Sequence, residues 1–343
     1  MIQTFSGKKA FFLGNGINCT ENNGGISWGN LLHRISMNFE IPCDLENELK
    51  PFPLAFEEMM RLKNGENTSE SKLRNVKTLI ASTFEDPANL IVSNIHRLFM
   101  NSGVKEIITT NYDYNLEMSV DSLFLENKHR YSLNNSESRY SLYRGYTIEG
   151  VTVRHIHGEL KHNRNTSRSA DNYPEESIMI GFEHYSAYSV RVQNVVNGEN
   201  PGGGNFEKDS VLSRIRHNMQ GKNWTDLFFT HRLIMVGFSL DFSETHIWWI
   251  LTKRDELRRS NQHPMVINNE IIFCIPQLPT VSSLSEDLTS EEAFLKKFRI
   301  KLNLQRNKAV GDILKSYGII IDVIQSSSYR NFYEQVAEKY RES

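Results

Sequence analysis

The chain has 343 residues, of which 39% are hydrophobic and 23% charged, and its formal net charge is −2. Such a composition provides the apolar side chains for a packed core and excludes global disorder. The charge lacks the positive excess typical of nucleic-acid-binding proteins, so we expect no direct binding of nucleic acid. No apolar run reaches the roughly 18 residues that suggest a membrane span, and the N-terminal residues do not resemble a signal peptide.

The first predicted elements surround a glycine turn. Residues 10–13 form a short apolar run typical of a buried strand, and Gly14-Asn15-Gly16 follow it directly. Apolar residues at helical spacing then predict a helix over residues 28–39, for which Ser27 is the expected N-cap. The pattern of residues 40–100 is also helical, so we expect a helical subdomain inserted after the first strand.

Further apolar runs follow along the chain, separated by helical or polar segments. They predict strands at residues 104–110, 151–158, 178–182, 232–240, 271–276 and 318–324, and helices at residues 243–259 and 329–341. Continuous apolar strands alternating with helices indicate an α/β fold with a Rossmann-like, mostly parallel sheet that has helices on both faces. We expect one domain over residues 1–343.

Two polar segments, residues 161–176 and 197–205, are predicted to be flexible surface loops. Two interpretations of these loops stay open. They are either a lid that frames a binding site or plain surface insertions.

Polar or glycine-rich residues follow several of the predicted strands, and ligands of such sheets bind outside the carboxyl ends of the strands. The glycines of Gly14-Asn15-Gly16 would let the backbone approach a pyrophosphate, although Cys19 occupies the place of the third glycine of the dinucleotide-binding fingerprint. Gly237-Phe238-Ser239 could bring N–H groups and a hydroxyl to a ribose or phosphate. The alternative for the first motif is a tight turn without a ligand.

Two other strand ends carry groups suited to chemistry. The carboxamide of Asn111 can orient a hydroxyl or hold a water, whereas Asn111 and Asp113 could instead cap a helix. His157 suits a general base, and the alternative is an ordinary hydrogen-bonded histidine. His155 and His157 would share one face of a regular strand, which suggests a metal site, but no third ligand is evident.

Taken in order, the motifs GNGIN, TTNYDYNLE, HIHGEL and GFSLDFSETHI resemble the sirtuin-like family over about residues 10–250. They are closer to its bacterial branch, which depletes NAD in antiphage defence, than to protein deacetylases. The resemblance implies cleavage of the nicotinamide–ribose bond of NAD, which yields nicotinamide and ADP-ribose or its cyclic form. It implies catalytic roles for Asn111, Asp113 and His157, and NAD contacts by Gly14, Asn15, Gly16, Asn18, Thr110, Gly237, Phe238 and Ser239.

The resemblance also assigns a role to each catalytic residue. Asn111 would position the ribose and a water, His157 would act as the general base, and Asp113 would hold the nicotinamide carboxamide. Family members of this length often depend on self-assembly or on a separate activating partner, such as a ring-shaped translocase ATPase. We therefore expect a homo-oligomer or such a partner.

The cysteines depart from the deacetylase pattern. Cys19, Cys43 and Cys274 are far apart, so they predict neither a zinc ribbon nor a disulfide framework, and they favour a reducing, cytoplasmic compartment. We expect no metal cofactor, and water or an internal hydroxyl as the acceptor. The alternatives are an NAD-dependent protein deacylase or ADP-ribosyltransferase, and a non-catalytic sensor of NAD or ADP-ribose that acts in assembly.

Overall fold

The computed structural model describes residues 2–3, 5–20, 25–41, 50–64, 70–85, 92–133, 140–160, 177–199, 209–219, 221, 223–260, 265–278 and 305–342. The predicted loop at residues 161–176, residues 200–205 of the second predicted loop, and Cys43 lie outside these residues.

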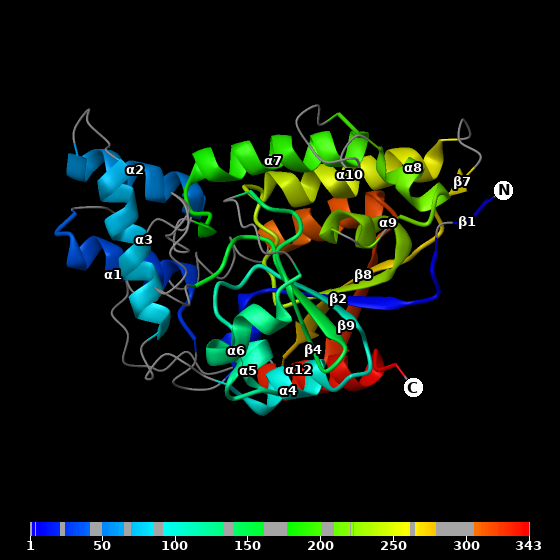
Figure 1. Ribbon diagram of the computed structural model, residues 1–343, viewed down its shortest axis with the longest axis horizontal. Helices are drawn as coiled ribbons and strands as arrows, with labels where there is room; N and C mark the ends of the chain where they lie inside the picture. The colour runs from blue at the N-terminus through cyan, green and yellow to red at the C-terminus, as the bar shows by residue number, and fades with distance from the viewer. Residues whose placement is uncertain are drawn as a thin grey trace.

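A seven-stranded sheet forms the centre of the molecule (Figure 1), with the strand order β4-β5-β3-β2-β6-β8-β9. Its strands are β2 (Lys9–Leu13), β3 (Glu106–Thr109), β4 (Tyr146–Ile148), β5 (Val151–His155), β6 (Arg232–Val236), β8 (Ile271–Gln277) and β9 (Ile320–Gln325). All neighbours are parallel except β4 and β5, which are antiparallel. The predicted Rossmann-like, mostly parallel sheet is therefore confirmed.

The chain begins this sheet in the middle and fills its two halves in turn. From β2 it moves outward through β3 to β5, and then returns to place β6 on the other side of β2 before continuing to β8 and β9. This is the strand order of doubly wound dinucleotide-binding sheets, in which the reversal of direction opens a crevice between the first and fourth strands. Here that crevice lies between β2 and β6.

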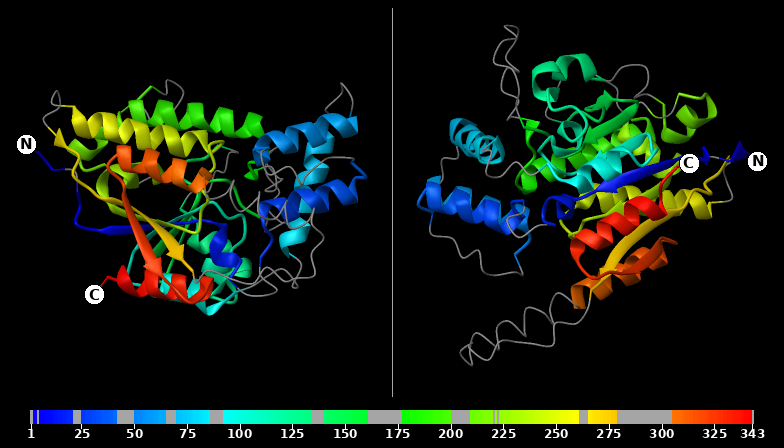
Figure 2. Two further views of the ribbon diagram at one scale, coloured as in Figure 1. Left: turned by 180° about the vertical axis from the view of Figure 1, so that it is seen from behind. Right: turned by 90° about the horizontal axis from the view of Figure 1, so that it is seen from below.

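Helices cover the sheet, and most of the helices that the structure describes belong to one of three groups (Figures 1 and 2). One face is covered mainly by α7 (Phe182–Asn197), α8 (Val211–Arg216), α9 (Leu227–Thr230) and α10 (Thr245–Arg259), and the other by α4 (Asn94–Met100), α5 (Asn115–Met118) and α12 (Tyr329–Lys339). Beyond one end of the strands lie α1 (Trp28–Asn38), α2 (Phe52–Asn64) and α3 (Glu70–Glu85). Smaller elements are β1 (Ile2–Gln3), β7 (Met265–Val266), α6 (Phe124–Tyr131) and the 3-10 turns η1 (Asn15–Asn18) and η4 (Trp224–Asp226).

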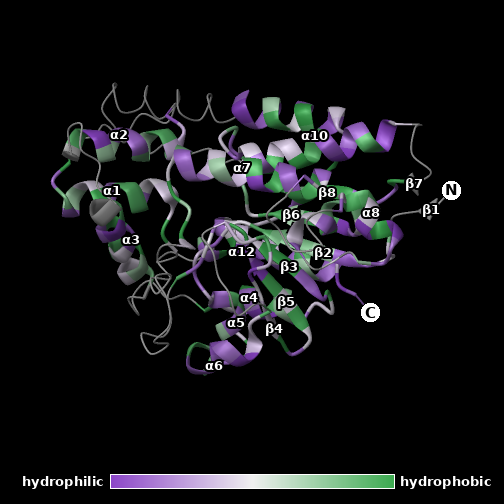
Figure 3. Cartoon of the chain, turned by 45° about the horizontal axis from the view of Figure 1, so that its top comes forward, coloured by the Kyte–Doolittle hydropathy of each residue, from purple (hydrophilic) through white to green (hydrophobic). Residues whose placement is uncertain are grey.

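Alternating side chains of the strands supply both faces of the core. On β2, Ala10 and Phe12 pack under α7 and α10, whereas Phe11 and Leu13 pack against α4 and α12. Apolar and polar residues alternate around α7 and α10 (Figure 3), because only one side of each helix faces the core. The period of two along the strand therefore divides the core into two layers.

A third cluster joins α1, α2 and α3 to the carboxyl edge of the sheet. Its buried members include Leu32 and Met59 from the helices, and Tyr112 and Ile178 from segments that follow strands. The hydroxyl of Ser27 accepts a hydrogen bond from the backbone N–H of Asn30 at 3.2 Å, as predicted for the N-cap of α1. This cluster holds helices over the edge at which ligands of such sheets bind.

The structure corrects one predicted strand and, within the described residues, adds short strands that were not predicted. Residues 178–180 are buried but belong to no strand, and α7 begins immediately afterwards at Phe182. The backbone N–H of Met179 bonds to the carbonyl of His157 at 2.8 Å, so the apolar run is buried as a connection rather than as a strand. Sequence reasoning missed β4, which has only three residues, and the two-residue strands β1 and β7. No helix in the described ranges is long and apolar enough to cross a membrane.

Candidate functional site

Two glycine turns touch where β2 and β6 end. The backbone N–H of Gly14 bonds to the carbonyl of Val236, and that of Gly16 to the carbonyl of Gly237, each at 2.9 Å. A Cβ atom on Gly14 would lie 2.4 Å from the Gly237 carbonyl oxygen, a distance that no real Cβ contact reaches. Gly237 itself has a φ of +82°, which favours glycine. Glycine is therefore required on both sides of the crevice.

A cavity of about 640 Å³ opens at this crevice, between the strand ends and helices α1 and α2. Its size lies within the range of small-molecule sites in proteins, roughly 300–1,000 Å³. Six of the residues predicted to bind a dinucleotide line it: Asn15, Gly16, Thr110, Gly237, Phe238 and Ser239. Trp28 also lines it, while its ring makes an edge contact with Tyr112 at 5.5 Å between centroids.

Charged side chains stand on the wall of this cavity. Lys50 lines the cavity, and its ammonium group forms an ion pair with Glu58 at 2.8 Å. Arg306 reaches the cavity from residues 305–316, which are helical, and forms an ion pair with Asp241, which also lines it. Either cation could pair with a phosphate instead. Arginine binds phosphate through two parallel hydrogen bonds, and lysine binds it as a point charge.

The other five predicted residues, Gly14, Asn18, Asn111, Asp113 and His157, are buried behind the cavity wall. Asn18 occupies the centre of a polar network there. Its amide nitrogen donates to Asp113 at 2.8 Å and to Asn15 at 3.0 Å. Its amide oxygen lies 2.8 Å from His96 Nε2 and accepts from the Asn115 amide at 3.2 Å. The network therefore joins the glycine turn to the segment after β3.

Asp113 acts in this network as the structural acceptor. Its second oxygen accepts the backbone N–H of Asn115 at 3.1 Å, at the start of α5. Burial raises the pKa of Asp113 above its ordinary value, although the hydrogen bonds from Asn115 and Asn18 and the charge of His155 oppose the rise. Burial also lowers the pKa of His96 to about 4, against a smaller opposing effect of the Ser93 backbone. His96 is therefore neutral at physiological pH.

The amide oxygen of Asn111, like that of Asn115, lacks a protein partner among the described residues. The side chain of Asn111 is buried, and Oδ1 makes no hydrogen bond within the described ranges. A buried acceptor left without a partner costs about 1–3 kcal/mol, and such atoms deserve a functional explanation. Thr110, which precedes Asn111 in the sequence, lines the cavity, whereas Asn111 itself does not.

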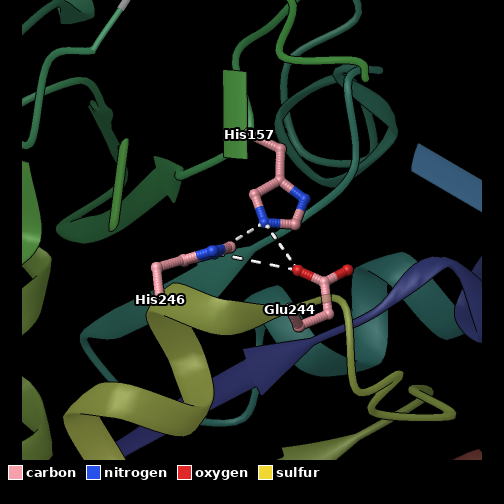
Figure 4. A group of neighbouring side chains, drawn as sticks. All are labelled: His157, Glu244 and His246. Atoms are coloured by element: carbon pink, nitrogen blue, oxygen red, sulfur yellow. Dashed lines mark hydrogen bonds and ion pairs between the residues drawn. The ribbon is translucent and has the colours of Figure 1, made fainter. Parts of the chain in front are cut away.

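His157 forms a compact cluster with two residues at the beginning of α10 (Figure 4). Its Nε2 atom lies 2.9 Å from Nε2 of His246 and 3.3 Å from Oε2 of Glu244, and the last two atoms are 3.8 Å apart. The three side chains point toward one another. Burial, and to a smaller extent His157, lowers the pKa of His246 well below its ordinary value, so this imidazole is neutral.

Two side chains connect this cluster with the cavity. Both histidines are fully buried, whereas the Glu244 side chain is 19% exposed and lines the cavity. The Tyr185 hydroxyl lies 3.4 Å from Nδ1 of His157, and Tyr185 also lines the cavity. His157 thus communicates with the cavity through a carboxylate on one side and a phenol on the other.

His155 and His157, which the alternation of a strand would place on one face, have different surroundings. β5 ends at His155, so His157 lies beyond the regular strand. Nε2 of His155 pairs with buried Glu117 at 2.7 Å, and Nδ1 lies 2.9 Å from the Asn111 carbonyl. Burial is the largest single effect and disfavours the charged imidazole, but the charge and hydrogen bond of Glu117, the charge of Glu159 and the Asn111 backbone together outweigh it and raise the pKa of His155 to about 9.

No protein-family model matches this sequence, and no curated protein is significantly similar to it. Sequence reasoning missed Tyr185, Glu244 and His246, which carry the polar groups nearest to His157. A signal for the last two existed, because SETHI follows the GFSL strand end after two intervening residues and places a carboxylate and an imidazole two residues apart. Tyr185 lies on α7 in a segment whose sequence gave no such signal.

Proposed function

We propose that this chain binds NAD in the cavity between β2 and β6 and cleaves its nicotinamide–ribose bond. The observation that carries the proposal is the position of the cavity. It lies at the carboxyl edge of a doubly wound sheet, at the point where the strand order reverses, and two touching glycine turns form its floor. In open α/β sheets this is where nucleotides bind.

The glycine turns support a dinucleotide in particular. The turn from β2 into η1 lines the cavity through Asn15 and Gly16, and such a turn is where dinucleotide-binding sheets hold the pyrophosphate. Ser239 and Thr110 offer hydroxyls at the wall for ribose contacts, and Trp28 offers an aromatic face. The resemblance of the motifs to the sirtuin-like family led to the same ligand from the sequence.

The chemistry would proceed through an oxocarbenium-like transition state as nicotinamide leaves. Asn111 would position the ribose and the attacking water or hydroxyl, for which its unpartnered amide oxygen is available. His157 would take up the proton, and Tyr185 and Glu244 connect it to the cavity. Asp113, whose oxygens are both occupied by Asn18 and Asn115, would support the nicotinamide end mainly by holding this segment in place.

A second candidate is binding of NAD or ADP-ribose without cleavage. The burial of His157 and Asn111 behind the cavity wall favours it, because a general base must come within hydrogen-bond reach of the proton that it removes. The two functions differ in one product. A sensor retains NAD intact, whereas the enzyme releases nicotinamide.

The proposal extends to the setting of the reaction. We propose a cytoplasmic NAD-depleting effector of bacterial antiphage defence, because scattered cysteines suit a reducing compartment and the motifs are closest to that branch. An enzyme of this kind must be restrained in its own cell. Self-assembly or a separate partner, such as a ring-shaped ATPase, would provide the restraint.

The decisive experiment is a time course of NAD with the purified protein, at several protein concentrations, with nicotinamide and ADP-ribose separated by chromatography. Calorimetry measures NAD binding in parallel. We expect both binding and release of nicotinamide. Binding with no product, at every protein concentration and with candidate partners added, would favour the sensor, and the absence of binding would refute both functions.

Two histidine variants connect the activity with the site. His157→Ala should fold and lose about 10²–10⁴ in turnover, the usual cost of removing a general base. His231→Gln is the matched control, since His231 is also buried but lies at the start of β6, and it should retain turnover. Full turnover in a folded His157→Ala protein would exclude the proposed base.

A further inference from the structure

We propose that His157, Glu244 and His246 bind a divalent transition-metal ion of the zinc class. The three residues come from two separate parts of the fold: His157 follows β5, whereas Glu244 is the N-cap of α10 and His246 lies in its first turn. One ligand atom of each lies within 4.8 Å of the others. The ion would therefore link the end of a central strand with the beginning of a covering helix.

The distances fit an ion at the centre of the cluster. The ligand atoms form a triangle with sides of 2.9, 3.3 and 3.8 Å. The point equidistant from its corners lies about 2.0 Å from each atom, and zinc binds histidine nitrogen and carboxylate oxygen at about 2.0–2.2 Å. An ion would thus need little movement of the three side chains.

The donor set selects the kind of ion. Two imidazole nitrogens and one carboxylate oxygen are the ligands of zinc in several enzymes and of non-haem iron(II) in facial triads. Calcium and magnesium prefer oxygen ligands, so the two imidazoles disfavour them. Three protein ligands also leave a coordination position for water, and Glu244 connects the site with the cavity from which water could enter.

Hydrogen bonding among the side chains explains the cluster less completely. One histidine can donate its Nε2 proton to the other, which accounts for the 2.9 Å contact. The buried Oε2 atom of Glu244 then still has no hydrogen-bond partner among the residues that the structure describes. A cation between the three atoms would supply this buried carboxylate oxygen with a partner.

The ion would have a consequence for the reaction, and this step rests on the proposed function. A metal bound to Nε2 of His157 takes the lone pair with which the imidazole would accept a proton, and Nδ1 already faces Tyr185. Added ion should therefore inhibit NAD cleavage rather than support it. The cluster would act as an inhibitory metal site beside the cavity.

The test begins with binding and needs no activity. The full chain is freed of metal with a chelator, and Zn²⁺ is then titrated by calorimetry, with Co²⁺ as a spectroscopic probe. We expect one ion per chain and a Co²⁺ visible spectrum without a thiolate charge-transfer band, since no cysteine belongs to the cluster. A thiolate band, or the absence of binding at micromolar Zn²⁺, would overturn the proposal.

Variants then locate the ion. Glu244→Gln and His246→Gln should each weaken binding by at least about 10-fold to 100-fold, the range known for disturbing the surroundings of metal ligands. His231→Gln, a buried histidine outside the cluster, should bind like the wild type. Glu244→Gln changes a partly exposed side chain, so it is expected to fold even if His246→Gln does not. Unchanged affinity in a folded Glu244→Gln protein would refute the site.

The inhibitory effect is measured separately, by adding Zn²⁺ to the NAD time course. Slower release of nicotinamide in the wild type, with a smaller relative slowing in His246→Gln at the same Zn²⁺ concentration, supports the arrangement. If no NAD is cleaved under any condition, the proposed function fails, while the titrations still decide whether the cluster binds an ion.

Discussion

The contact between the two glycine turns makes a sharp prediction for Gly14→Ala. The new Cβ atom would meet the Gly237 carbonyl oxygen at 2.4 Å, its carbon at 2.7 Å and Cδ1 of Phe238 at 2.7 Å. Two of these atoms are backbone, so the clash is relieved only if β2 and β6 move apart at their ends. Overpacking of this kind typically costs about 1–3 kcal/mol, which reduces the folding equilibrium constant by a factor of roughly 5 to 160.

Gly29→Ala is the matched control, because Gly29 lines the same cavity but lies in the first turn of α1. Its Cβ would meet only the Ser27 hydroxyl, at 4.0 Å. Alanine in a helix is favoured over glycine by up to about 1 kcal/mol, so this variant should be as stable as the wild type or more so. Urea unfolding followed by circular dichroism measures both. Equal unfolding midpoints for Gly14→Ala and the wild type would refute the close contact, and with it the proposed floor of the cavity.

Three other predictions concern the polar groups and the assembly. His96 takes up a proton at its ordinary pKa of 6.5 in the unfolded chain, but only at a pKa of about 4 in the folded protein. The free energy of unfolding should therefore decrease as the pH falls from 6.5 to 4, by about 3 kcal/mol in total. His96→Gln should lack this loss, and parallel stability profiles of the two proteins between pH 7 and 4 would contradict it. Asn111→Ala should lose NAD turnover but change the unfolding free energy by less than about 1 kcal/mol, because the Asn111 amide oxygen has no partner to lose among the described residues. Asn18→Ala should reduce the unfolding free energy by about 2 kcal/mol or more, because it removes the centre of a hydrogen-bond network. Equal losses of stability in the two variants would reject the distinction. If assembly gates the enzyme, turnover per chain should increase with protein concentration alongside the mass measured by light scattering, and a highly active monomer would exclude it.

The sheet was predictable because its strands are apolar on both faces. The runs that contain Phe11, Ile107, Ile234 and Ile272 are buried between two helical layers, so each run is continuous and bounded by turn residues. The same signal failed at residues 178–180, which are equally apolar. Burial without a partner strand produces the same composition as a short strand, and only the sheet pairing distinguishes the two.

The site was predictable where it depends on backbone and not where it depends on side chains from elsewhere. A glycine that follows an apolar run indicates a strand end, and the parallel sheet then brings Gly14 and Gly237 together. His157 follows β5, whereas its neighbour Tyr185 lies on α7. Between the two elements, the sequence contains a segment of 16 residues that the structure does not describe. Periodicity carries no information on how two such elements are placed.

The three strand-end residues that the motifs single out have unequal claims to chemistry. Asp113 has both oxygens engaged, one by Asn18 and one by the backbone of Asn115, so removing it would break a buried network whether or not a ligand binds. A loss of activity in Asp113→Ala would therefore be no evidence for catalysis.

Asn111 has the strongest claim, because it is a buried amide whose oxygen is left for a partner that the described part of the chain does not supply. His157 is intermediate: its Nδ1 faces Tyr185, its Nε2 lies near His246 and Glu244, and of these neighbours Tyr185 and Glu244 line the cavity wall. Thr110, Tyr185 and Glu244 line the cavity, whereas Asn111 and His157 are buried. The proposed chemistry would therefore depend on how these wall residues respond when the cavity is filled.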